Sequence, residues 1–96
     1  MLEDVKALLG IEGTDKDRIL QLLITQAIDE AKDFTHREDI YPLQSTIEKM
    51  VIFNYNKMGV EGLDSESYSG QSYHYSADYP ESIMRTLKRY RKLIVL

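Results

Sequence analysis

The sequence predicts a mainly α fold: a small domain of three main helices and a short N-terminal helix, with a hairpin-like or flexible loop excursion before the last helix. Apolar residues recur at spacings of three and four in four stretches of the chain. Gly10, Gly59 and Pro80 stand at the borders of those stretches, where helices commonly stop or start. Residues 64–80 contain no Leu, Ile, Val, Met or Phe, so they contribute little to a core.

Length and composition indicate one folded domain over residues 1–96, with the excursion at 60–80. Hydrophobic residues make up 43% and charged residues 29% of the 96 positions, which is typical of a globular chain rather than a disordered one. No run of about 18 apolar residues occurs, so we expect no membrane span. The absence of cysteine excludes disulfides, a thiolate nucleophile and a Cys-based zinc site.

The first two helices follow from periodicity. The spacing predicts a short helix over Leu2–Leu9, stopped by Gly10, with one apolar face. Thr14 and Asp17 resemble a capping box at the start of the next helix, which we expect to run to about Phe34 or His36. Seven residues predict a broad buried stripe along it: Leu20, Leu23, Ile24, Ala27, Ile28, Ala31 and Phe34. In the short helix predicted over Leu2–Leu9, the apolar face comprises Leu2, Val5, Leu8 and Leu9.

The third helix is predicted over Leu43–Met58, after a polar connection at 36–42. Pro42 suits a helix start, and Gly59 is expected to end the helix. The predicted buried face comprises Leu43, Ile47, Met50, Val51, Asn54 and Met58. Ile52, Phe53 and Tyr55 widen the apolar arc, so more than one side of this helix should be covered.

The excursion is rich in serine and tyrosine, and its pattern fits a small hairpin with a turn near residues 69–71. It carries four of the seven tyrosines: Tyr68, Tyr73, Tyr75 and Tyr79. Aromatic rings are costly in water, and tyrosine gives a large contact area at low entropic cost. We therefore expect these four rings to meet another protein.

The last helix is predicted from Pro80 onward, with Ile83, Met84, Leu87, Tyr90 and Ile94 buried. Residues 1–81 carry a net charge of −9, whereas residues 82–96 carry +5. A basic stripe opposite the buried face comprises Arg85, Lys88, Arg89 and Lys92. The stripe fits oriented contact with an acidic partner or with another copy of the chain. It also fits simple complementation of the helix dipole.

The sequence also bears on catalysis and on DNA binding. His36 and His74 lie in polar connections without metal-ligand spacing, and neighbouring carboxylates on a helix point in different directions, so we expect no catalytic residues, metal or cofactor. The basic stripe could instead contact DNA phosphates in a small cytoplasmic regulator. The sequence pI of about 5.1 argues against this, since dedicated nucleic-acid binders usually exceed about 9.

Several motifs together resemble one family. Residues 65–70 read Ser-Glu-Ser-Tyr-Ser-Gly, and residues 78–80 read Asp-Tyr-Pro before a basic helix. Earlier come Leu8-Leu9-Gly10-Ile11, the charged start at residues 15–17, and Met50-Val51 leading to Tyr55-Asn56. Over nearly the whole chain this resembles the head–tail connector (adaptor) proteins of tailed bacteriophages and prophages.

The resemblance implies a structural, non-enzymatic role. Such proteins assemble as a ring, expected here to be a dodecamer, beneath the portal of the phage head. The ring extends the DNA channel and docks a stopper or tail-completion protein, and DNA passes through without specific binding. We thus expect a virion protein, made in the host cytoplasm, whose partners are other copies of itself, the portal and the stopper. The portal, if its lower face is acidic, is one candidate target for the basic helix.

Overall fold

The computed structural model describes residues 1–61 and 79–92, and it confirms the mainly α class. Those residues form four α-helices, one short 3₁₀ helix and no strand. The helices are α1 (Leu2–Leu9), α2 (Asp17–Thr35), η1 (Tyr41–Leu43), α3 (Gln44–Glu61) and α5 (Glu81–Arg89). The predicted hairpin and its turn near residues 69–71 lie outside the described residues.

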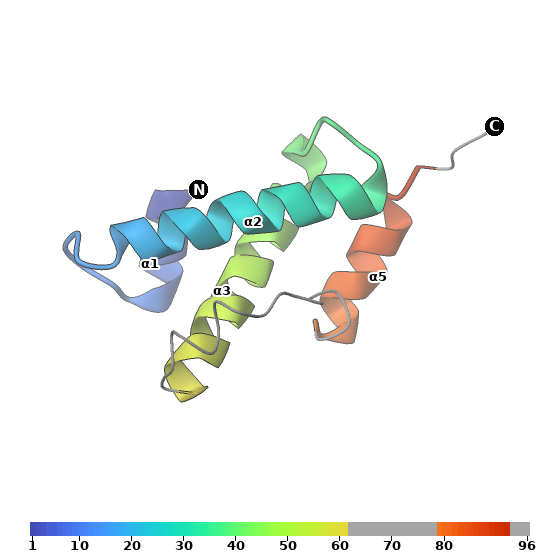
Figure 1. Cartoon of the computed structure of the whole chain (residues 1–96). Helices are drawn as coiled ribbons and strands as arrows, with labels where there is room; N and C mark the ends of the chain where they lie inside the picture. Colours follow the sequence, from blue (N-terminus) through green and yellow to red (C-terminus); the bar gives the residue numbers. More distant parts are fainter. Residues whose placement is uncertain (62–78, 93–96) are drawn as a thin grey trace.

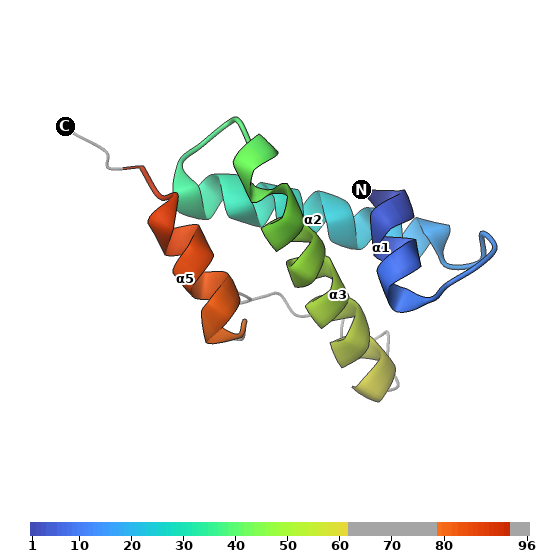
Figure 2. The same cartoon turned by 180° about the vertical axis from the view of Figure 1, so that it is seen from behind.

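The long helix α2 lies across α3, and the two shorter helices complete the fold at opposite ends (Figure 1). Helices α1 and α5 each contact both α2 and α3. Seen from behind, α3 runs between α1 and α5 (Figure 2). This arrangement leaves one side of α2 and one side of α5 facing solvent.

The core gathers the apolar stripes that face inward from all four helices. Leu20, Leu43 and Ile47 are completely buried, which places the centre of the core between α2 and α3. The remaining buried hydrophobic residues are Val5, Leu23, Ile24, Ala27, Ala31, Met50, Val51, Tyr79, Ile83 and Leu87. Burial of these side chains supplies most of the favourable free energy of folding.

Helix α1 has the predicted bounds, and Gly10 ends it in the left-handed conformation at φ 71°. The N–H of Ile11 donates to the carbonyl of Lys6 at 2.9 Å, as in the usual glycine stop. The predicted face is wrong at one residue. Val5 is buried, but Leu8 is 66% exposed because the partners of this short helix cover only one side of it.

The start of α2 differs from the prediction. The helix begins at Asp17, its N-cap is Lys16, and no side chain caps it, so the expected Thr14–Asp17 capping box does not form. Asp17 instead forms an ion pair with Lys6 of α1, with Nζ and Oδ1 2.7 Å apart. This ion pair joins α1 to the first residue of α2 but does not cap the helix, since it satisfies none of the free backbone N–H groups.

The inner stripe of α2 lies largely where the period of 3.6 puts it. Ile28 and Phe34 sit at its edges and are half-buried. Thr35, absent from the predicted stripe, is fully buried, and its hydroxyl donates to the carbonyl of Ala31 at 2.6 Å. That bond satisfies a polar group that would otherwise be costly to bury.

Helix α3 begins one residue after the predicted start, because Tyr41–Leu43 forms the 3₁₀ turn η1 with Pro42 inside it. The predicted end at Gly59 is wrong, since α3 continues to Glu61. Glycine permits a helix stop but does not impose one, and it costs only about 1 kcal/mol relative to alanine inside a helix. Ile52, Phe53 and Tyr55 are half-buried against the core, which confirms that more than one side of α3 is covered.

Helix α5 begins directly after Pro80, as predicted, with Ile83 and Leu87 buried. It ends at Arg89, so the predicted stripe of four cations on one helix is too long: Lys92 lies beyond α5. The N–H of Lys92 donates to the carbonyl of Thr35 at 2.9 Å. The chain thus leaves the helix to bond with the C-terminal end of α2. Ile94 lies outside the described residues.

Candidate functional site

Tyr79 joins the chain preceding α5 to the two long helices, α2 and α3. Its ring is 7% exposed and lies 5.5 Å from the ring of Phe53, centroid to centroid. Its hydroxyl donates to Oε1 of Glu30 at 2.5 Å and accepts from Nδ2 of Asn54 at 3.0 Å. Residues of α2 and α3 therefore fix the point where α5 begins.

Burial raises the pKa of Glu30 from 4.5 to about 7, although the hydrogen bond from Tyr79 lowers it in part. The physical cause is the loss of hydration of the charged carboxylate. The second oxygen of Glu30 is also buried, and no hydrogen-bond partner satisfies it among the residues described. The carboxyl group at this junction therefore takes up a proton near neutral pH.

The outward side of α5 carries three exposed cations: Arg85, Lys88 and Arg89. Arg85 forms an i,i+4 ion pair with Glu81 at 3.5 Å, and both side chains are well exposed. Such a surface pair contributes at most about 1 kcal/mol. Among the residues that the structure describes, Lys88 and Arg89 have no ion-pair partner. These three residues are called the α5 basic face below.

Two arginines join the C-terminal end of α5 to the C-terminal end of α2. The guanidinium of Arg91 lies 4.7 Å above the ring of Phe34, and that of Arg37 lies 5.5 Å from the ring of Tyr90. Arg37 also donates from Nε to the carbonyl of Tyr90 at 2.7 Å. These contacts hold the C-terminal end of α5 against the end of α2, so the two helices are fixed relative to each other.

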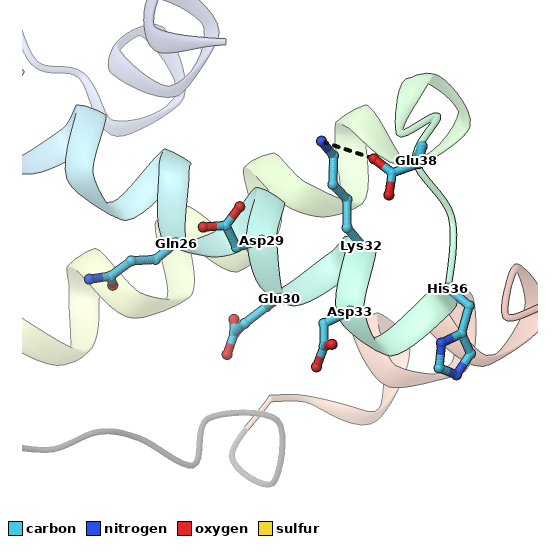
Figure 3. Close-up of a pocket in the computed structure, with 7 residues that line it drawn as sticks. All are labelled: Gln26, Asp29, Glu30, Lys32, Asp33, His36 and Glu38. Atoms are coloured by element: carbon cyan, nitrogen blue, oxygen red, sulfur yellow. Dashed lines mark ion pairs between the residues drawn. The ribbon is translucent and has the colours of Figure 1, made fainter.

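The side of α2 away from the core is acidic. A broad, shallow hollow there is lined by Gln26, Asp29, Glu30, Lys32, Asp33, His36 and Glu38 (Figure 3). Lys32 and Glu38 approach each other at 3.9 Å. Asp29 and Asp33 are exposed, and within the described part of the chain neither has an ion-pair partner. These two residues are called the α2 acidic face below.

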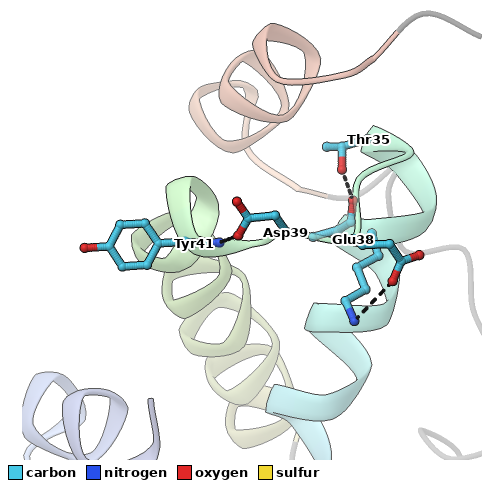
Figure 4. Close-up of polar contacts among 6 residues, drawn as sticks. Thr35, Glu38, Asp39 and Tyr41 are labelled. Atoms are coloured by element: carbon cyan, nitrogen blue, oxygen red, sulfur yellow. Dashed lines mark hydrogen bonds and ion pairs between the residues drawn. The ribbon is translucent and has the colours of Figure 1, made fainter.

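The connection from α2 to α3 presents one large aromatic side chain to solvent. The backbone N–H of Tyr41 donates to Oδ1 of Asp39 at 3.0 Å, which orders the turn (Figure 4). The Tyr41 side chain is nevertheless 80% exposed. The sequence predicted no contact role for Tyr41, because this residue belongs to the polar connection at 36–42.

The predicted contact residues have different surroundings. Arg85, Lys88 and Arg89 lie together on α5 and are exposed, and the Lys92 side chain is exposed beyond the helix. The Tyr79 ring is used inside the chain, so it is not a free surface. Tyr68, Tyr73 and Tyr75 lie outside the described residues, and their predicted role stays a prediction.

Two features were missed by sequence reasoning. Glu30 and Asn54 were not identified as partners of Tyr79, because they are 49 and 25 residues away in sequence. Asp29 and Asp33 of the α2 acidic face were not singled out as a pair, although their four-residue spacing places them on one side of a helix. In the described residues, no group of three or more His, Cys, Asp or Glu side chains is placed to hold a metal ion. No helix there is long and apolar enough to cross a bilayer.

The fold defines a small helical domain with a predominantly acidic body and a basic last helix. A family model described as phage gp6-like head-tail connector protein matches residues 1–91. The chain therefore belongs to the phage gp6-like head-tail connector family, which is structural rather than enzymatic, and this confirms the resemblance seen in the sequence. No curated protein and no solved structure matches the chain at a significant level.

Proposed function

We propose that this protein is a subunit of the connector ring that forms beneath the portal of a tailed phage or prophage. The family match over residues 1–91 is the observation that carries the proposal. In this role the chain forms a homo-oligomeric ring, expected to be a dodecamer, which extends the DNA channel. The ring docks a stopper or tail-completion protein on the side away from the head.

The architecture suits a ring subunit because its helices are held rigidly together. Helices α2, α3 and α5 share one core, and Tyr79, Arg37 and Arg91 fix α5 relative to α2. A rigid subunit presents its contact faces at constant angles, which a closed ring requires. Contact with neighbours and with the portal is then assigned to Tyr68, Tyr73 and Tyr75 together with Arg85, Lys88, Arg89 and Lys92.

Tyr79 has a modified role within this proposal. Because its ring is buried and its hydroxyl is bonded to Glu30, it supports the position of α5 rather than meeting a neighbour directly. The other three tyrosines keep the predicted role of direct contact. The acidic charge of the body is compatible with a channel that lets DNA pass, since like charges repel at short range.

Deletion of the gene from the phage or prophage tests this function. The expected result is accumulation of DNA-filled heads without tails, with normal infectious particles restored by the gene supplied in trans. Mass spectrometry of purified wild-type particles should also detect the protein. Normal tailed particles from the deletion strain would refute the proposal.

The second candidate is a cytoplasmic DNA-associated regulator, and the exposed α5 basic face is the observation that favours it. Salt-dependent binding of the purified chain to random duplex DNA would support it. A gene located beside a regulatory cassette, rather than between capsid and tail genes, would point the same way. The connector predicts neither observation.

A further inference from the structure

We propose that the α5 basic face of one copy docks on the α2 acidic face of the neighbouring copy, in a head-to-tail contact. The inference rests on the proposed ring and deepens it by assigning an interface between subunits. The occupant of each face is a second copy of this chain, because the chain itself carries both halves of the charge pair. The two faces lie on different helices, so the contact is heterologous and suits a ring.

The acidic half of the contact is a ridge on the solvent side of α2. Leu22, Gln26, Asp29 and Asp33 recur at spacings of four, three and four, so they lie along one line of the helix. All four are exposed, and Leu22 is 48% exposed. The ridge thus adds an apolar side chain to the two carboxylates of the α2 acidic face.

The basic half is the solvent side of α5. Arg85 and Arg89 are four residues apart, opposite the buried Ile83 and Leu87. Asp29 and Asp33 are also four residues apart, so each pair spans about 6 Å along its helix. Packed side by side, the two helices bring both arginines within reach of both aspartates. Arginine can bind a carboxylate through two parallel hydrogen bonds, which favours a fixed register.

The contacts inside the chain leave these groups available. Lys32, the cation beside Asp29 and Asp33, approaches Glu38. Arg91, on the chain that leaves α5, lies over the ring of Phe34. Arg85 has only the exposed Glu81 as a partner, at 3.5 Å, and exchanging a weak surface pair for a bidentate one is favourable. The two faces therefore keep unmatched charge of opposite sign.

Charge reversal tests the contact with a restoring variant. One variant carries Arg85→Glu and Arg89→Glu, a second carries Asp29→Arg and Asp33→Arg, and a third carries all four changes. All four positions are exposed, so the fold should be kept, as circular dichroism will check. The matched control is Lys16→Glu with Lys49→Glu, which changes the charge as much as the first variant at exposed lysines outside both faces.

Incorporation into phage particles, measured by quantitative mass spectrometry, should fall at least tenfold for each two-residue reversal. The control should incorporate normally, and the four-residue exchange should recover incorporation because opposite charges face each other again. When the two reversal variants are purified and mixed, sedimentation should show association between them. Neither variant should associate with itself under the same conditions.

Two outcomes would overturn the inference. Normal incorporation of either reversal variant would show that its face is not needed. If reversal on α5 alone abolished incorporation and the four-residue exchange did not restore it, the α5 basic face would dock on another protein such as the portal. Both outcomes leave the proposed function intact, since wild-type protein would still be present in particles. Absence of wild-type protein from particles would refute the proposed function, and the mixing experiment would still test the contact between copies.

Discussion

Tyr79→Phe should destabilise the chain by about 2 kcal/mol at pH 8, because the hydroxyl joins α2 and α3 at the start of α5. The change removes the bond to Glu30 at 2.5 Å and the bond from Asn54 at 3.0 Å, while the ring keeps its packing on Phe53. A neutral hydrogen bond contributes about 0.5–1.5 kcal/mol, and one to a charged group about 1.5–3 kcal/mol. Solvent access at these half-buried partners reduces the sum.

Urea unfolding and thermal melting measure this effect. For a domain of this size, 1 kcal/mol corresponds to about 4–8 °C in Tm, so Tyr79→Phe should lower Tm by about 8–16 °C. The loss of stability should be smaller at pH 5, because Glu30 is protonated there and accepts a weaker hydrogen bond from Tyr79. Tyr41→Phe is the matched control, since it removes the same hydroxyl from an 80% exposed ring and should change stability by less than about 0.5 kcal/mol. A Tyr79→Phe variant as stable as the control at pH 8 would refute the role assigned to Tyr79.

Three further predictions concern pH, the core and a helix end. Since the pKa of Glu30 lies above its ordinary value of 4.5, its contribution to the free energy of unfolding is fully present below pH 4.5 and lost as pH rises through about 7. Glu30→Gln should therefore be more stable than wild type at pH 8, on the order of 1 kcal/mol after solvent screening, and pH-dependent melting that is unchanged by the variant would contradict this. Leu20→Ala should cost about 2–5 kcal/mol in urea unfolding because Leu20 is fully buried, whereas Leu22→Ala at 48% exposure should cost far less; equal losses would contradict the core assignment. Gly10→Ala should cost about 1 kcal/mol through strain alone, since φ is 71° and no atom lies near an added Cβ; a stabilised variant would rule out the left-handed stop.

Local periodicity was enough to predict the helices and most of the core. The stripe on α2 and the glycine stop of α1 depend on residues close in sequence, so a pattern of threes and fours reveals them. The errors arise where distant residues compete with local signals. Asp17 pairs with Lys6 instead of forming a capping box with Thr14, and Lys92 bonds to Thr35 instead of continuing α5. A sequence pattern contains no information about such tertiary partners.

The site was predictable only in part, for the same reason. The cations of α5 could be assigned to one exposed face, because their spacing is a property of the helix itself. The burial of Tyr79 could not, since its partners Glu30 and Asn54 come from two other helices. Its position in the serine- and tyrosine-rich excursion predicted contact with another protein instead. A second carboxyl group, that of Glu48, is 9% exposed, and burial together with the neighbouring Asp4 raises its pKa. This environment could also be recognised only from the packed structure.

The most direct test of the connector assignment is single-particle electron microscopy of the portal ring mixed with this protein. We expect a ring of copies beneath the portal, with α5 of each copy lying against the solvent side of α2 of the next. Tailed particles from the same phage should contain the same ring. A chain that stays dispersed beside bare portal rings, in a phage whose particles also lack it, would refute its role as a connector subunit.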